Sequence, residues 1–269
     1  MCAELIITAA TGYQKSDIET FIYSFLQNTS ASAAIVIQES DKEIHKWLQS
    51  NPRVRIFSIK TLSDPRHMVI KRFEVFQKII EIIKPRKVLL CDSRDVFFQD
   101  SPIPKSITAS QDSCLVLAEE PIKIHQCPIN SQWIRRFFSS EALTRVGEKN
   151  VICAGTIGGQ SQTVLELLRL LCEMLEEKQT QLKATPWGLD QACLNFLIHS
   201  KQTSIENIVF SNNDIGPWLT LHHEANISIN KLGFVTPSAE TANPATLIHQ
   251  HDRLPWLTRH LHSQLIQSH

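Results

Sequence analysis

The chain has 269 residues, and its 27 Lys and Arg balance its 27 Asp and Glu, so its formal net charge is zero. Hydrophobic residues make up 42% and charged residues 20%, which is ordinary globular usage and excludes a disordered chain. The zero balance argues against a protein that binds nucleic acid mainly through charge. No apolar run approaches the roughly 20 residues of a transmembrane segment, and the first residues lack the basic start of a signal peptide. We therefore expect a globular protein of the cytoplasm.

Short apolar runs alternate with segments of helical periodicity along the first half of the chain. Strands are expected at 5–10, 34–37, 54–59 and 88–91, and helices at 16–26, 41–48 and 67–83. In the second half, strands are expected at 115–118 and 208–210, helices at 132–138, 161–178 and 188–199, a glycine-rich turn at 155–159, and a helix from Pro255 onward. This alternation predicts a mostly parallel sheet covered by helices on both faces. Because no linker or repeat divides the chain, we expect a single α/β domain over 1–269.

The strongest chemical signal follows the apolar run 88–91. Asp92 ends that predicted strand, and a turn through Ser93 and Arg94 can bring Asp95 to the same side. Open α/β sheets bind ligands at the carboxyl ends of their strands, and two carboxylates suit Mg²⁺ or Mn²⁺ that bridges a diphosphate. The alternative is a solvated turn in which one Asp pairs with Arg94.

Two further segments contain polar residues at positions suited to a ligand site. Asp190 and Gln191 lie in the first turn of a predicted helix, where Asp is often only a capping residue. His249 and His251 alternate, so on an extended segment both imidazoles would point the same way. One of them can then be a metal ligand, with Arg253 close enough to hold a phosphate; the alternative is a pair of unrelated surface residues.

These segments occur in an order that resembles GT-A type nucleotide-sugar glycosyltransferases, most closely the glycogenin-like and lipopolysaccharide galactosyltransferase-like group. The resemblance covers about 5–256 and rests on several short motifs. They are the strand and turn 6–13, Arg72 placed 20 residues before Asp92, D-x-x-D at 92–95 where the family has D-x-D, A-G-x-x-G from Ala154, D-Q-x-x-L-N from Asp190, and Pro255-Trp256 as an echo of the family's C-terminal motif.

The resemblance implies a Rossmann-like, mostly parallel sheet of the GT-A type, in which about 1–118 hold the nucleotide donor. About 119–269 would then hold the acceptor and carry the C-terminal metal and phosphate segment. The implied activity is metal-dependent transfer of a sugar from a UDP-sugar, or secondly a GDP-sugar, to an acceptor hydroxyl with retention of configuration. The acceptor stays open between a saccharide, a lipid, a small molecule and a protein.

The same resemblance implies three groups of site residues. Asp92 and Asp95, with His249 or His251, would hold Mn²⁺ or Mg²⁺. Catalysis at the reacting face is assigned to Asp190 and Gln191. The implied donor-binding residues are Thr8, Ala9, Ala10, Tyr13, Arg72, Asp92, Ser93, Arg94, Gly158, Gly159 and Arg253.

Departures from the family pattern leave alternatives open. For an inverting enzyme, the general base would be Asp190 or Asp214. The altered D-x-x-D spacing also fits a non-catalytic nucleotide-sugar-binding or scaffold protein of the same fold. A metal-dependent phosphohydrolase with an aspartate nucleophile is the third class, but its acidic strand usually lies near the start of the chain, whereas Asp92 lies a third of the way along.

Overall fold

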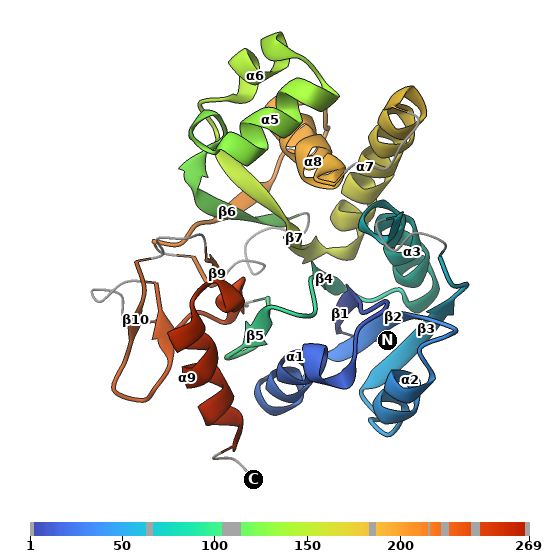
Figure 1. Ribbon diagram of the computed structural model, residues 1–269, viewed down its shortest axis with the longest axis vertical. Coiled ribbons are helices and arrows are strands. Elements are labelled where there is room, and N and C mark those ends of the chain that lie inside the picture. The colour runs from blue at the N-terminus through green and yellow to red at the C-terminus, as the bar shows by residue number, and fades with distance from the viewer. Residues whose placement is uncertain are drawn as a thin grey trace.

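The computed structural model describes residues 3–62, 67–103, 114–182, 187–214, 216–221, 226–237 and 243–266. They form an α/β fold in which helices flank a central sheet (Figure 1). The described helices are α1 (Lys15–Asn28), α2 (Lys42–Gln49), α3 (Met68–Ile83), α5 (Pro128–Phe137), α6 (Ser140–Val146), α7 (Ser161–Leu182), α8 (Leu189–His199) and α9 (Pro255–Ile266). The central sheet contains β1 (Glu4–Ala9), β2 (Ser32–Gln38), β3 (Val54–Ile59), β4 (Lys87–Cys91), β6 (Leu115–Lys123), β7 (Asn150–Gln160) and β8 (Ile208–Ser211).

The strand order of the central sheet is β3-β2-β1-β4-β7-β6-β8. The neighbours β3, β2, β1 and β4 run parallel, and β8 runs parallel to β6. Only β7, among the described strands of this sheet, runs antiparallel to its neighbours β4 and β6. The prediction of a mostly parallel sheet with flanking helices is therefore confirmed.

Both faces of the central sheet are buried, each under its own hydrophobic core. Successive residues of a strand point to opposite sides, so neighbouring residues enter different cores. In β1, Leu5 and Ile7 pack into a core that also contains side chains of α3, α5, α7 and α8. Ile6, between them, packs into a second core formed with α1 and α2. The apolar runs of the sequence are thus the inner strands of the sheet.

A smaller sheet brings the C-terminal part of the chain to the end of β4. It contains β5 (Val96–Phe98), β12 (Leu247–His249) and β9 (Trp218–Thr220), in the order β5-β12-β9. β12 pairs antiparallel with β5, so that His249 lies opposite Val96. Helix α9 packs against this sheet through Leu257 and Leu261, and a short hairpin of β10 (Ser228–Ile229) and β11 (Val235–Thr236) lies nearby. Because β5 starts directly after Asp95, this pairing fixes His249 beside the acidic turn.

The prediction of a glycine-rich turn at 155–159 is wrong, since these residues lie inside the continuous strand β7. Gly158 lies opposite Leu89 on one neighbouring strand and Val116 on the other. Gly159 has a φ of 143°, and a Cβ there would lie 2.2 Å from the carbonyl oxygen of Cys114. The paired glycines let the strands approach closely, so they serve the sheet and not a turn.

Candidate functional site

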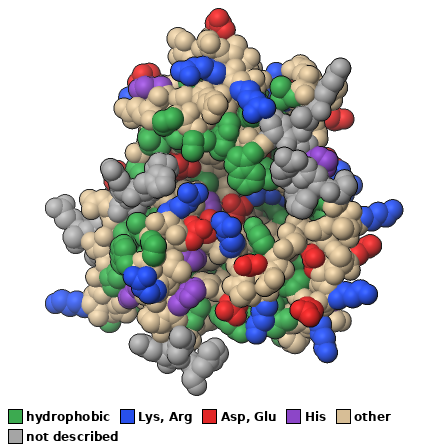
Figure 2. Space-filling model, in the orientation of Figure 1, with side chains coloured by type: hydrophobic (Ala, Val, Ile, Leu, Met, Phe, Trp, Pro, Cys, Tyr) green, Lys and Arg blue, Asp and Glu red, His purple; other side chains and the backbone are tan. Residues whose placement is uncertain are grey.

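A cavity of about 530 Å³ opens where β1 and β4 end. Its lining comes from the turn after β1, from α3, from the acidic turn after β4, and from β6, α5, β7, α8 and the segment that follows β12. Figure 2 shows this hollow with acidic, basic and histidine side chains inside it and hydrophobic side chains along one side. This position agrees with the expectation that the ligand lies at the carboxyl ends of the parallel strands.

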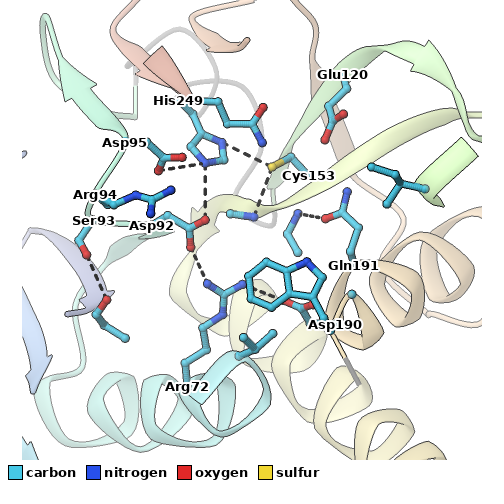
Figure 3. A pocket seen from close by; sticks show the side chains of 18 of the residues that line it. Arg72, Asp92, Ser93, Arg94, Asp95, Glu120, Cys153, Asp190, Gln191 and His249 are labelled. Atoms are coloured by element: carbon cyan, nitrogen blue, oxygen red, sulfur yellow. Dashed lines mark hydrogen bonds and ion pairs between the residues drawn. The ribbon is translucent and has the colours of Figure 1, made fainter. Parts of the chain in front are cut away.

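Three side chains at the cavity form a group that can hold a metal ion, as Figure 3 shows. Nε2 of His249 lies 3.6 Å from Oδ2 of Asp92 and 3.6 Å from Oδ1 of Asp95. The His249 side chain is only 1% exposed, and its Nε2 is buried without a hydrogen-bond partner. A buried polar atom without a partner is unfavourable unless something binds it. A divalent cation fits this position, because each of the three residues offers a ligand atom.

The missing side chain of Gly155 explains how Asp92 and His249 can both lie so close to the backbone of β7. A Cβ at this position would lie 2.6 Å from Oδ2 of Asp92 and 2.6 Å from Cε1 of His249. The backbone of β7 also holds the acidic turn, since the amide of Asp92 donates to the carbonyl of Gly155 at 3.0 Å. Of the glycines in the A-G-x-x-G motif, Gly155 is the one beside the ligand atoms.

The other ring nitrogen of His249 faces the interior of the fold. Nδ1 lies 3.3 Å from Oγ1 of Thr156 and 3.5 Å from Sγ of Cys153. Both contacts come from β7, which fixes the plane of the imidazole. The ring is therefore held so that Nε2 points at the two carboxylates.

Arg72 of α3 links the acidic turn to α8. Its Nη1 donates to Oδ1 of Asp92 at 2.5 Å, and its Nη2 donates to Oδ2 of Asp190 at 2.9 Å. Burial alone would raise the pKa of Asp92, but the charge of Arg72 and the contacts with His249 outweigh it and hold this pKa well below its usual range. Burial raises the pKa of Asp95, and His249 offsets this rise only in part. Asp92 is therefore the more acidic of the two carboxyl groups.

The two residues expected to be catalytic both line the cavity. Asp190 is 6% exposed, and its carboxylate is engaged by Arg72. Gln191 accepts a hydrogen bond from the amide of Ala154 through Oε1 at 2.8 Å. Asp214, the other candidate for a general base, is exposed and does not belong to the described lining of the cavity.

Several expected donor-binding residues also line the cavity, among them Arg72, Asp92, Ala9 and Tyr13. Ser93 belongs to the lining too, and its hydroxyl donates to the carbonyl of Ala9 at 3.1 Å, which ties the acidic turn to the end of β1. The side chains of Arg94 and Arg253 are 57% and 50% exposed. Both arginines line the cavity, and both contact the exposed carboxylate of Asp252, Arg94 at 3.3 Å and Arg253 at 3.9 Å.

Other expected residues are not among the described residues that line the cavity: Thr8, Ala10, Gly158, Gly159 and His251. The first four are buried inside the fold. The expectation that both imidazoles point the same way is wrong, because β12 ends at His249 and Gln250 takes a left-handed conformation with a φ of 62°. Nδ1 of His251 instead contacts Oγ1 of Thr258 at 3.1 Å, so His249 alone of the pair joins the acidic residues.

Among the cavity residues to which the sequence analysis gave no role are Glu120 on β6, Trp133 on α5, and Trp187 before α8. Burial raises the pKa of Glu120 to about 7. The predicted strand ended at 118, whereas β6 continues to Lys123 through register shifts around Glu119, so Glu120 fell outside the prediction. Trp133 lies in the helix expected at 132–138, and Trp187 directly precedes the helix expected at 188–199; the sequence analysis gave neither tryptophan a role at the site.

Comparisons of the chain with protein-family models and with curated protein sequences find no match. Among the described helices, none is both long enough and apolar enough to cross a bilayer.

Proposed function

We propose that this protein is a metal-dependent glycosyltransferase of the GT-A type. It moves a sugar from a nucleoside-diphosphate sugar, with UDP favoured and GDP as the second candidate, to an acceptor hydroxyl. The observation that carries this proposal is the unpartnered Nε2 of His249, which faces Asp92 and Asp95 at a cavity where the parallel strands end. Although the D-x-x-D spacing departs from the family's D-x-D, the turn still brings both carboxylates to one point.

Asp92, Asp95 and His249 would hold the ion. Carboxylates suit Mg²⁺ and Mn²⁺, and an imidazole ligand favours the transition metal, so we propose Mn²⁺ before Mg²⁺. When bound, the ion supplies charge stabilisation for a diphosphate leaving group. A protein that binds only an uncharged ligand would have no use for a metal ion at this position. The triad therefore favours an anionic ligand.

The remaining residues of the site bind and orient the donor. The exposed guanidinium groups of Arg94 and Arg253 can neutralise phosphate oxygens, since a charge-assisted bond to phosphate is strong. Tyr13, which follows the turn after β1, offers a ring for the nucleoside. Asp190 and Gln191, on the opposite side of Arg72, would then face the sugar.

The proposal is tested by the release of UDP from UDP-glucose and UDP-galactose, with Mn²⁺ and after chelation. We expect metal-dependent release by the wild type and a loss of at least about 100-fold in Asp92→Asn, because a metal ligand is removed. The control is Asp100→Asn, which changes an exposed carboxylate outside the described cavity lining. The configuration of the released sugar, read by NMR before it equilibrates, tests the proposed retention.

Other results of this experiment would contradict the proposal. Metal-dependent nucleotide binding without release from any sugar donor would favour the scaffold protein. Release of phosphate from simple monoesters, with sugar donors untouched, would favour the phosphohydrolase.

A further inference from the structure

Three large apolar side chains form one side of the cavity, away from the metal-binding group. Ile129 and Trp133 come from α5, and Trp187 precedes α8. Trp187 is 66% exposed and Ile129 is 56% exposed. Aromatic side chains that stay exposed at a cavity are unfavourable in water, and they mark binding surfaces. In Figure 2, hydrophobic side chains gather on one side of the hollow.

The indole of Trp133 is fixed against the start of α8. A Cβ at Gly188 would lie 2.1 Å from Cε2 of Trp133, so the ring lies directly on the glycine backbone. Gly188 has a φ of 82°, which a residue with a side chain rarely adopts. The ring of Trp133 is therefore packed against the start of α8 and gives this part of the cavity a defined aromatic surface.

Polar groups face the same space. Gln191 uses its Oε1 for the amide of Ala154, which leaves the N–H groups of its Nε2 to donate, and its side chain offsets part of the rise in the pKa of Glu120. Glu120 is 5% exposed and sits in the cavity lining. A carboxylate can accept several hydrogen bonds, and a buried one with few donors gains from a ligand that brings hydroxyl groups. Figure 3 shows Glu120 above Gln191 on the side of the pocket away from Arg72.

We propose that this part of the cavity is the acceptor site and that the acceptor is a saccharide; this inference rests on the function proposed above. A sugar ring has apolar C–H faces and hydroxyl groups around its edge. Its face lies on Trp187 and Trp133, while its hydroxyls donate to Glu120. An alkyl chain matches the aromatic side but brings no donors to the buried carboxylate.

Saturation-transfer NMR on the whole protein, without nucleotide or metal, tests this site. The probes are lactose, maltose and methyl β-glucoside at millimolar concentration, with hexanol as the apolar comparison. We expect transfer to at least one saccharide, and binding roughly tenfold weaker in Trp187→Ala because one stacking surface is lost. Glu120→Ala should weaken binding as well. Trp256→Ala, which changes an exposed tryptophan of α9 outside the described lining, is the matched control and should bind as the wild type does.

Three results would overturn the inference: no transfer to any saccharide, equal transfer in the wild type and Trp187→Ala, or Trp187-dependent transfer to hexanol alone. The failure of the proposed function looks different. Saccharide binding without any metal-dependent nucleotide binding would leave a sugar site in a protein that is not a transferase. Nucleotide binding without saccharide binding would remove only the inferred acceptor class.

Discussion

The two ring nitrogens of His249 lie in different surroundings, and this difference orients the proposed ligand. Nδ1 contacts Thr156, while Nε2 has no hydrogen-bond partner and faces the carboxylates. Groups that hold the far nitrogen of a metal-binding histidine fix its ring and its tautomer. The affinity for metal therefore depends on a residue that does not touch the ion.

Thr156→Val tests this dependence, because it removes the hydroxyl and keeps the shape. We expect the affinity for Mn²⁺, measured by calorimetric titration, to fall about 10-fold. The control is Thr220→Val, since Thr220 is equally buried and its hydroxyl has no partner. Equal affinities in the two variants would show that Thr156 does not position the ring.

Gly155→Ala should separate the ligand site from the stability of the sheet. A methyl group there would collide with the carboxylate of Asp92 and the ring of His249, and these side-chain ends can shift. Gly159→Ala instead meets the fixed backbone of Cys114. We expect the first variant to fold and lose Mn²⁺ affinity, and the second to lose thermal stability. A Gly155→Ala protein that binds Mn²⁺ like the wild type would contradict the proposed metal position.

The raised pKa of Glu120 makes stability depend on pH. Burial raises this pKa from 4.5 to about 7, so the folded state binds the proton more tightly than the unfolded state. In acid the buried carboxyl of Glu120 is protonated and neutral, so it does not oppose folding. As pH rises to about 7 the carboxyl ionises, and the free energy of unfolding falls. We expect Glu120→Gln to be more stable than the wild type by about 3 kcal/mol at about pH 8 and by much less at about pH 5. Urea unfolding at both pH values measures this, and a difference that does not change with pH would refute it.

At the scale of elements, Arg72 joins α3 to the end of β4 and to the start of α8. The side chain of Asp190 is 8% exposed, so loss of Arg72 leaves a buried carboxylate without its cation. Breaking such a buried pair destabilises a protein strongly.

Arg72→Ala should therefore lower the free energy of unfolding by about 3 kcal/mol, measured by urea denaturation. Adding Asp190→Asn to that variant should recover part of the loss, because the unpaired charge disappears. A single variant as stable as the wild type would mean that Arg72 serves the ligand and not the packing of these elements.

The central elements could be predicted from the sequence, and the small sheet could not. The run 88–91 is apolar throughout because β4 is buried on both faces, and α7 shows a clear apolar stripe. β5 and β12 have three residues each, too few for a periodic pattern. The glycines at 158–159 suggested a turn because local signals cannot show that two strands approach closely on either side.

At the scale of the whole molecule, the candidate site joins parts of the chain that are far apart. Asp92 and Asp95 were identified as a pair from their position after an apolar strand. The choice of His249 over His251 required the pairing of β12 with β5, which is a long-range contact. Glu120 and the tryptophans became visible only as residues that share one cavity with the acidic turn.

The most direct test of the account is the thermal stability of the protein with UDP, in the presence and absence of Mn²⁺. Ligand at about a hundred times its dissociation constant adds about 2.7 kcal/mol to the free energy of unfolding, which is a visible shift in Tm. We predict that UDP raises Tm only when Mn²⁺ is present, and that Asp92→Asn loses this effect. If neither UDP nor GDP shifts Tm with the metal, or if the shift is the same without it, the proposed metal-dependent nucleotide site is wrong.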